Sequence, residues 1–169
     1  LYRLPPDLIE NNNGDITSIA RLCNGGLAPY WSREEIETRF PLAGNELLYL
    51  ADPIESFILH IQGSGKIRFR DGSYRSVRFA GSNGRPYRSI GKLLVDEGRL
   101  TLEQATLPGI VGYLRAHPGE VRRILHANPR FIFFAWGKAD AVRGSANIAL
   151  TAGRSVAVDP SVIPLGTVA

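Results

Sequence analysis

The stretch FILHIQGSGKIRFRDGSYRSVRFAG, residues 57–81, decides the expected fold. Residues 56–61 read as a half-buried strand, and basic and apolar side chains alternate again from Lys66 to Arg70. The turn signal Asp71-Gly72-Ser73 precedes another alternating run, so the sequence predicts a β-hairpin with one apolar and one basic face. Gln62-Gly63-Ser64-Gly65 interrupts the first strand with no apolar side chain to bury.

The interruption offers exposed backbone for binding. Glycines at positions 63 and 65 permit unusual dihedral angles and close approach of a ligand, beside the Gln62 amide and the Ser64 hydroxyl. Such a surface suits a polar, uncharged ligand. The alternative is a β-bulge that only bends the strand. Ser64 is a poor nucleophile candidate, because no helix is expected to follow it.

A second candidate surface lies in residues 83–89. Asn83, Tyr87, Arg88 and Ser89 combine an amide, an aromatic ring, a guanidinium group and a hydroxyl in one loop. These groups can hydrogen bond to a sugar and stack on its apolar face. Tyrosine also packs at the base of loops, so a purely structural role stays open.

Composition excludes several other classes of protein. With 44% apolar and 21% charged residues, the 169-residue chain is typical of ordinary globular proteins, and no apolar run reaches bilayer length. Cys23 is the only cysteine, so an internal disulfide is excluded, and His60, His117 and His126 are too widely spaced for a metal site. We expect neither metal nor cofactor. The net charge of +4 suits an anionic partner without requiring one.

The expected order of elements is strands, a helical block, then strands. Ser32 and Glu35 form a capping box, and Ser89 begins a helical region that ends at Asn128. Residues 130–135 return to strand, and residues 147–150 and 155–158 are further short strands. This order predicts a mainly β or α+β fold with a helical insertion.

Five motifs together resemble the membrane-bound lytic murein transglycosylase A (MltA) family. They cover nearly the whole chain in order: Tyr30-Trp31-Ser32-Arg33-x-Glu35-Ile36; Asp52-Pro53-Ile54-Glu55-x-Phe57 running into the glycine loop; Asn83-Gly84-x-x-Tyr87-Arg88-Ser89-Ile90-Gly91; Asn128-x-x-Phe131-x-Phe133-Phe134; and Leu150-Thr151-x-x-Arg154-Ser155-x-Ala157-x-Asp159 ending in Ile163-Pro164-x-Gly166. The set is specific, whereas the glycine loop alone would not be.

The resemblance implies the fold, activity and location. Residues 1–150 would form a small β-barrel domain of the kind inserted into a double-psi β-barrel, and residues 151–169 would begin that second barrel. The family cleaves the β-1,4 bond between N-acetylmuramic acid and N-acetylglucosamine in peptidoglycan without water, giving 1,6-anhydromuramic ends. We expect a periplasmic, monomeric protein that binds a glycan strand. Any attachment to the outer membrane would come from a lipid anchor outside this chain.

The catalytic acid is expected outside the chain. The family's aspartate lies in a later Asp-x-Gly-x-Ala-Ile-Lys-Gly segment without a counterpart here, and the chain, which lacks an initiator methionine, reads as a piece of a longer protein. Glu55 and Asp159 are weak candidates for this acid. Glu55 can face solvent or form an ion pair, and Asp159 is typical of a turn. The chain departs from the family pattern at His60 and at residues 141–145.

The competing hypothesis is a nucleic-acid module. A small barrel with basic strands and aromatic residues at Tyr74, Phe79 and positions 131–134 could bind a single strand. Against it, the charge excess is small and no ribonucleoprotein-type motif is present.

Overall fold

One six-stranded sheet and several short helices make up the computed structural model, which describes residues 1–5, 9–11, 18–137, 151 and 153–155. The strand order is β1-β2-β5-β4, with β3 paired to β2 and β6 paired to β5. The strands are β1 (Ile9–Asn11), β2 (Ser18–Cys23), β3 (Gly26–Pro29), β4 (Ser64–Arg68), β5 (Tyr74–Ser82) and β6 (Ile132–Trp136). The expectation of a mixed α and β fold is confirmed, while barrel closure stays a prediction.

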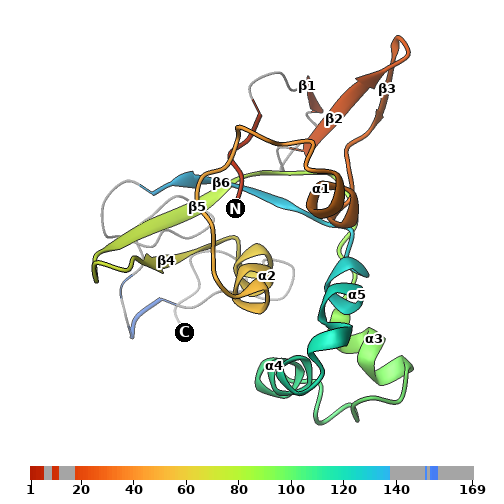
Figure 1. Ribbon diagram of the computed structural model, residues 1–169, viewed down its shortest axis with the longest axis vertical. Coiled ribbons are helices and arrows are strands. Elements are labelled where there is room, and N and C mark those ends of the chain that lie inside the picture. Colours follow the sequence, from red (N-terminus) through yellow and green to blue (C-terminus); the bar gives the residue numbers. More distant parts are fainter. Residues whose placement is uncertain (6–8, 12–17, 138–150, 152, 156–169) are drawn as a thin grey trace.

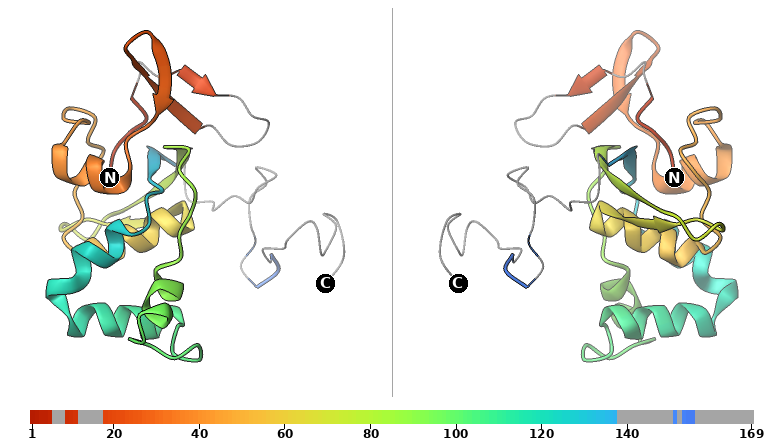
Figure 2. Two further views of the ribbon diagram at one scale, coloured as in Figure 1. Left: turned by 90° about the vertical axis from the view of Figure 1, so that its right-hand side faces the viewer. Right: turned by 90° about the vertical axis from the view of Figure 1, so that its left-hand side faces the viewer.

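The helices gather mainly at one end of the molecule. They are α1 (Arg33–Arg39), α2 (Pro53–Gln62), α3 (Ile90–Asp96), α4 (Leu107–Ala116), the 3-10 helix η1 (Pro118–Glu120) and α5 (Val121–His126). Figures 1 and 2 show α3, α4 and α5 as a lobe at the end opposite the β2–β3 hairpin, with α2 between this lobe and the sheet. None of these helices, in the part of the chain that is described, could cross a membrane.

Residues 56–61 belong to helix α2, so the strand predicted there is wrong. The Asp52 side chain accepts a hydrogen bond from the Ile54 amide at 2.8 Å, and Pro53 occupies the first turn, where its missing N–H costs nothing. Asp52-Pro53 is therefore a helix start and not a turn before a strand.

Helix α2 was not predicted from the sequence because it buries apolar side chains on two sides. Ile54 and Phe57 pack into the core formed with α3, α4 and α5. Leu59 packs instead against β4, β5 and β6. Residues buried on two sides blur the helical period, and a short apolar run cannot be assigned by periodicity alone.

Gly63 turns the chain from helix into strand. It has φ of +73°, and its N–H donates to the Leu59 carbonyl at 2.8 Å, which is how glycine commonly ends a helix. A Cβ on Gly65 would lie 2.7 Å from Leu59 Cδ1, so a larger residue there would force the buried Leu59 side chain of α2 to move. The glycine-rich segment is thus a helix-to-strand corner, and the bulge within a strand is excluded.

The predicted hairpin is confirmed. Strands β4 and β5 pair antiparallel from Ser64 opposite Arg78 to Arg68 opposite Tyr74. Between them, Gly72 has φ of +83°, and the Ser73 amide donates to the Asp71 carboxylate at 2.9 Å. The apolar face of this hairpin packs into the core through buried Ile67 and Val77.

Local helix signals were also predicted correctly. Ser32 and Glu35 form the expected capping box at α1, and the Ser89 hydroxyl caps α3 by accepting the Lys92 amide at 3.1 Å. Thr101 and Gln104 form the reciprocal hydrogen bonds of a capping box, but the next helix, α4, begins only at Leu107. Residues 141–145, 147–150, 156–158 and Asp159 lie outside the described residues.

A buried arginine fastens α1 to the rest of the fold. Arg33 is 2% exposed and donates to the Glu37 carboxylate at 2.9 Å and to the Arg130 carbonyl at 3.0 Å. Its guanidinium lies 4.7 Å from the ring centre of Phe57 and 5.2 Å from that of Phe131. The basic residue of the first family motif therefore has a structural role.

His60 is an interior residue of α2. Its Nδ1 accepts the Ile132 amide at 3.1 Å, and its ring lies against Phe131 and Phe134 at centroid distances of 4.4 and 5.1 Å. Burial, together with the positive charge of Arg33, lowers the pKa of His60 well below its ordinary value of 6.5. The imidazole is therefore neutral in the folded protein at neutral pH.

This burial predicts a loss of stability in mild acid. Below pH 6.5 His60 binds a proton in the unfolded chain but stays unprotonated in the folded chain. The free energy of unfolding should therefore fall by up to about 1.4 kcal/mol per pH unit as the pH drops from 6.5 toward the folded pKa. Urea unfolding between about pH 7.5 and 5 measures this, above the range where carboxylates such as Glu35 titrate.

The variant His60→Gln is the control, because an amide oxygen can replace Nδ1 as acceptor for the Ile132 amide without titrating. Its stability should depend less on pH over the same range. Equal pH dependence of both proteins would contradict the assignment.

Candidate functional site

A buried asparagine holds the start of the loop formed by residues 84–89. The Asn83 side chain is 1% exposed, and its Nδ2 donates to the carbonyls of Trp31 at 2.9 Å and Pro129 at 2.8 Å. Its Oδ1 accepts the amides of Phe131 at 2.9 Å and Arg85 at 3.3 Å. All four hydrogen-bonding positions of this amide group are used, so none is left for a ligand.

A second buried asparagine holds the other end of the loop. Asn128 Oδ1 accepts the amides of Arg88 and Arg130, both at 3.2 Å. Its buried Nδ2 has no hydrogen-bond partner among the described residues. Arg85 Nε also donates a hydrogen bond to the Tyr30 carbonyl at 2.9 Å, which holds the loop at a third point. The loop is thus fixed from the interior.

Between this loop and α2 lies a small cavity of about 120 Å³. Gln62, at the end of α2, and Tyr87 and Ser89, from the loop, line it together. Tyr87 is 50% exposed, so its ring is accessible at the cavity. The remaining lining is apolar except for Gly91 and comes from α2, α3 and α4: Ile54, Phe57, Ile58, Ile61, Ile90, Leu107, Ile110, Val111 and Leu114.

The structure thus brings residues of both predicted surfaces to one place, since Gln62, Tyr87 and Ser89 line the cavity, whereas Gly63, Ser64 and Gly65 do not. Gly63, Ser64 and Gly65 continue the chain directly from Gln62 as the helix-to-strand corner. The exposed Arg88 side chain does not line the cavity, and Asn83 lies in the interior beneath the loop. Ser89 lines the cavity, and its hydroxyl caps α3.

The apolar floor of this cavity was not predicted from the sequence. A helical pattern was present, because Ile54, Phe57, Ile58 and Ile61 recur at the three- and four-residue spacing of one helix face, but Leu59 on another side of the helix obscured it. Together with Leu107, 52% exposed, and Ile61, 46% exposed, this floor gives the site an apolar part next to its polar groups. Such a combination suits a ligand with both polar and apolar faces.

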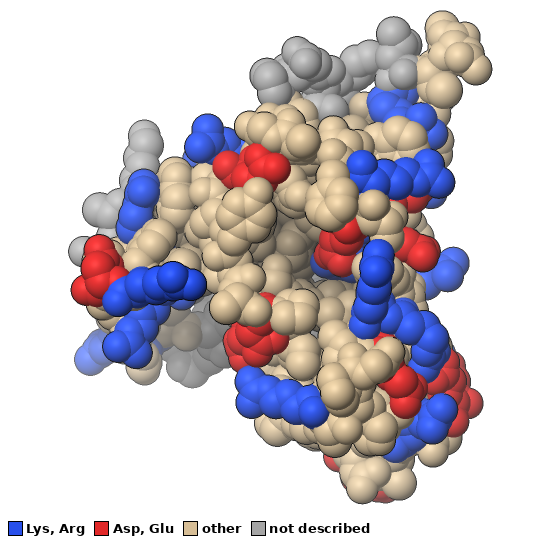
Figure 3. Space-filling view, viewed as in Figure 1, with Lys and Arg blue, Asp and Glu red and all other residues tan. Residues whose placement is uncertain are grey.

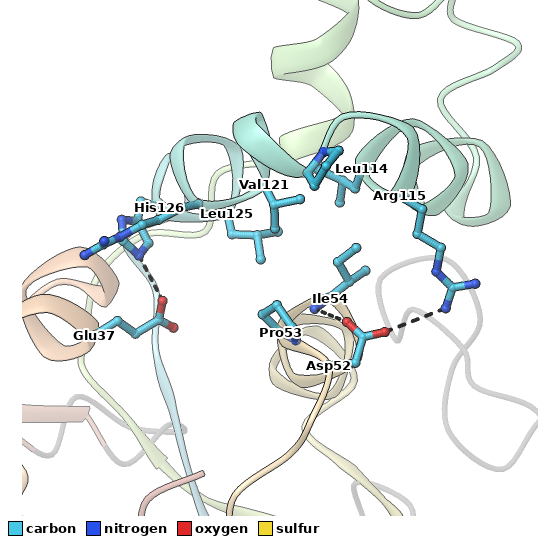
Figure 4. Close-up of a pocket in the computed structure, with 11 residues that line it drawn as sticks. Glu37, Asp52, Pro53, Ile54, Leu114, Arg115, Val121, Leu125 and His126 are labelled. Carbon is cyan, nitrogen blue, oxygen red and sulfur yellow. Dashed lines mark hydrogen bonds and ion pairs between the residues drawn. The ribbon is translucent and has the colours of Figure 1, made fainter.

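A larger cleft of about 540 Å³ lies on another side of α2, where the helix faces α4 and α5 (Figure 4). Apolar side chains such as Ile54, Leu114 and Leu125 point into it. None of the predicted site residues lines this cleft.

Charged and hydrogen-bonding side chains lie at the edges of this cleft. His126 Nε2 is within hydrogen-bond distance of the Glu37 carboxylate at 2.9 Å, and the Arg115 guanidinium forms ion pairs with Asp52 at 3.8 Å and Glu55 at 3.4 Å. Glu55 is therefore an ion-pair carboxylate at the start of α2, about 12 Å along the helix axis from Gly63.

Comparison with known proteins decides the family. The family model described as "MltA specific insert domain" matches residues 1–135. The chain belongs to the MltA family. It is 35% identical over 169 residues to membrane-bound lytic murein transglycosylase A of Escherichia coli, and 40% identical over 126 residues to that of Vibrio cholerae. These matches cover 99% and 73% of the chain but only 41% and 34% of the relatives, so the chain spans about two-fifths of their length or less.

Solved structures of lytic transglycosylases are similar to this chain in fold. A lytic transglycosylase of Burkholderia pseudomallei, LtgG, is 41% identical with a TM-score of 0.72, over 98% of this chain and 46% of that one. The membrane-bound lytic murein transglycosylase of Agrobacterium tumefaciens is 29% identical with a TM-score of 0.78, over 94% and 46%. Escherichia coli MltA with bound chitohexaose is 33% identical with a TM-score of 0.74, over 93% and 48%.

The interior position of Asn83 predicts a structural phenotype. Asn83→Ala removes four hydrogen bonds and leaves buried backbone groups unpaired, so the free energy of unfolding should fall by roughly 1–3 kcal/mol or more. Arg88→Ala, at the exposed side chain in the same loop, should change it by no more than about 0.5 kcal/mol. Denaturant unfolding measures both, and an Asn83→Ala variant as stable as the unchanged chain would contradict the scaffold role.

Proposed function

We propose that this chain is the glycan-binding part of a lytic murein transglycosylase. The observation that carries the proposal is the cavity in which Gln62, Tyr87 and Ser89 meet beside the Gly63 corner. Membership of the MltA family and the bound chitohexaose of the Escherichia coli relative support it. The ligand would be a peptidoglycan strand of alternating N-acetylglucosamine and N-acetylmuramic acid.

The lining groups match the chemistry of such a sugar. The Tyr87 ring can stack on the apolar face of a pyranose, while the Gln62 amide and the Ser89 hydroxyl can exchange hydrogen bonds with sugar hydroxyl or acetamido groups. The apolar floor can receive an acetamido methyl group. Ser64 and the backbone at positions 63 and 65 would extend this surface, and Arg88 would lie at its edge.

Catalysis would depend on an acid outside this chain. In a lytic enzyme the 6-hydroxyl of muramic acid attacks the sugar, so one carboxyl group can protonate the glycosidic oxygen and then accept the hydroxyl proton. Such an acid needs a raised pKa and a partly desolvated site. Residues 1–150 would form the inserted domain and supply one wall of that site, and residues 151–169 would lead into the other barrel. The whole enzyme would act in the periplasm.

Chitohexaose binding tests the glycan site. Tyr87→Ala should weaken binding to the chain about tenfold, equivalent to about 1.4 kcal/mol, and Gln62→Ala should weaken it less. The control is Tyr49→Ala, because Tyr49 is 81% exposed and lies outside this cavity. Calorimetric titration would measure the three affinities. Gly63 is a poor test position, because a valine at its φ of +73° would strain the helix end as well.

Two results would contradict the proposal. Equal chitohexaose affinity for Tyr87→Ala and the unchanged chain would remove the assigned surface. Binding of a single-stranded oligonucleotide that weakens steeply with salt, without binding of chitohexaose, would favour a nucleic-acid module, because neutral sugars hardly respond to salt.

A second experiment tests the location of the acid. The 169-residue chain should bind chitohexaose but release no 1,6-anhydromuramic product from murein. Product release, measured by chromatography of the soluble fragments, would contradict the proposal and would assign the acid to a residue of this chain.

A further inference from the structure

The solvent-facing side of the β4–β5 hairpin carries a row of cations that the proposed glycan site does not use. In the strand register, Ser64 lies opposite Arg78, Lys66 opposite Ser76, and Arg68 opposite Tyr74. Because side chains alternate across a strand, these six residues share one face. Lys66, Arg68 and Arg78 are all exposed, and neighbouring positions on one strand are about 7 Å apart.

The opposite face of the hairpin is different. Ile67 and Val77 are buried there, and the Arg75 guanidinium lies 3.8 Å from the ring centre of Trp136. Arg75 has the same charge as the row on the solvent face but points to the other side. A substitution of Arg75 is therefore a matched control, because it removes the same charge from the other face of the hairpin.

Among the residues that the structure describes, the cations of the row have no acidic partners. Residues 64–82 contain five basic residues and one acidic residue, Asp71, whose carboxylate accepts the Ser73 amide at 2.9 Å in the turn. None of the five is within ion-pair distance of a carboxylate among the described residues, although ion pairs occur at the helices. Figure 3 shows basic residues gathered over the hairpin at the left of the molecule.

The row begins where the proposed glycan surface ends. Ser64 is the first residue of β4 and follows Gln62-Gly63 directly, so the row begins two residues after the cavity-lining Gln62, on the hairpin face turned away from α2. A neutral sugar gives such cations no counter-charge. A murein strand, however, carries peptide substituents with several carboxylates at regular intervals along the glycan.

We propose that the face formed by Lys66, Arg68 and Arg78 binds the carboxylates of the peptide stems on a murein strand whose glycan lies at the Gln62 and Tyr87 cavity. The inference rests on the proposed glycan-binding function and adds a substrate preference to it. The chain would bind peptide-bearing strands more tightly than bare chitin-type oligosaccharides, with a salt-dependent difference.

The test compares two ligands and two variants. The ligands are soluble murein glycan strands with intact peptide stems, and chitohexaose. The triple variant Lys66→Gln/Arg68→Gln/Arg78→Gln should bind the peptide-bearing strands on the order of tenfold more weakly, because each exposed charge pair contributes little alone. Its affinity for chitohexaose and its melting temperature should stay the same. Arg75→Gln should weaken binding of the strands less than about twofold at physiological salt, where screening limits distant charges.

A failure of this inference and a failure of the proposed glycan-binding function would give different results. Unchanged affinity of the triple variant for peptide-bearing strands, or an equal loss for Arg75→Gln, would overturn the inference while Tyr87-dependent binding of chitohexaose still stood. An equal loss for chitohexaose would also overturn it. If the unchanged chain bound neither ligand, the proposed function itself would fail, and the inference with it.

Anionic vesicles of phosphatidylglycerol and phosphatidylcholine provide the remaining comparison. If the triple variant lost binding to the vesicles but kept its affinity for peptide-bearing strands, the cations would serve a lipid surface, and the inference would be overturned. If vesicle binding is weak and the same for both proteins, while strand binding differs, the stem carboxylates are the ligand.

Discussion

The fold depends on one buried amide group where the sheet meets the helices. The Asn83 side chain donates to the carbonyls of Trp31 and Pro129 and accepts the amides of Arg85 and Phe131, so it pairs polar groups from two distant parts of the backbone and from its own loop. A buried network of this kind is valuable because each group left unpaired there costs free energy. The loop that follows is fixed as a consequence, and Tyr87 is half-exposed at its end.

The second constraint is the end of α2. Because Gly63 stops the helix in a left-handed conformation, Gln62 remains at the cavity while β4 starts immediately afterward. The same helix therefore lines the apolar floor of the site and supports the sheet through Leu59. The corner at positions 62–64 also joins the proposed sugar-binding cavity to the cationic strand β4, whose charged face is turned away from α2.

Local signals were readable from the sequence, and long-range ones were not. The capping box at Ser32 and the turn at Asp71-Gly72 depend on residues within a few positions, and both were predicted correctly. Helix α2 was misread because it packs on two sides, which depends on partners far along the chain. Asn83 looked like a ligand-binding residue, because its partners at Trp31 and Pro129 lie 52 and 46 positions away and leave no local pattern.

The central claim is that the corner at Gly63 and the loop at Tyr87 together face a carbohydrate. Backbone amide NMR shifts of the chain, followed during titration with chitohexaose, test this most directly. The account predicts that the largest changes occur at residues 62–65 and 87–89, the two segments that meet at the small cavity. Changes confined to the cleft at Glu37 and His126, or no changes at saturating ligand, would contradict it.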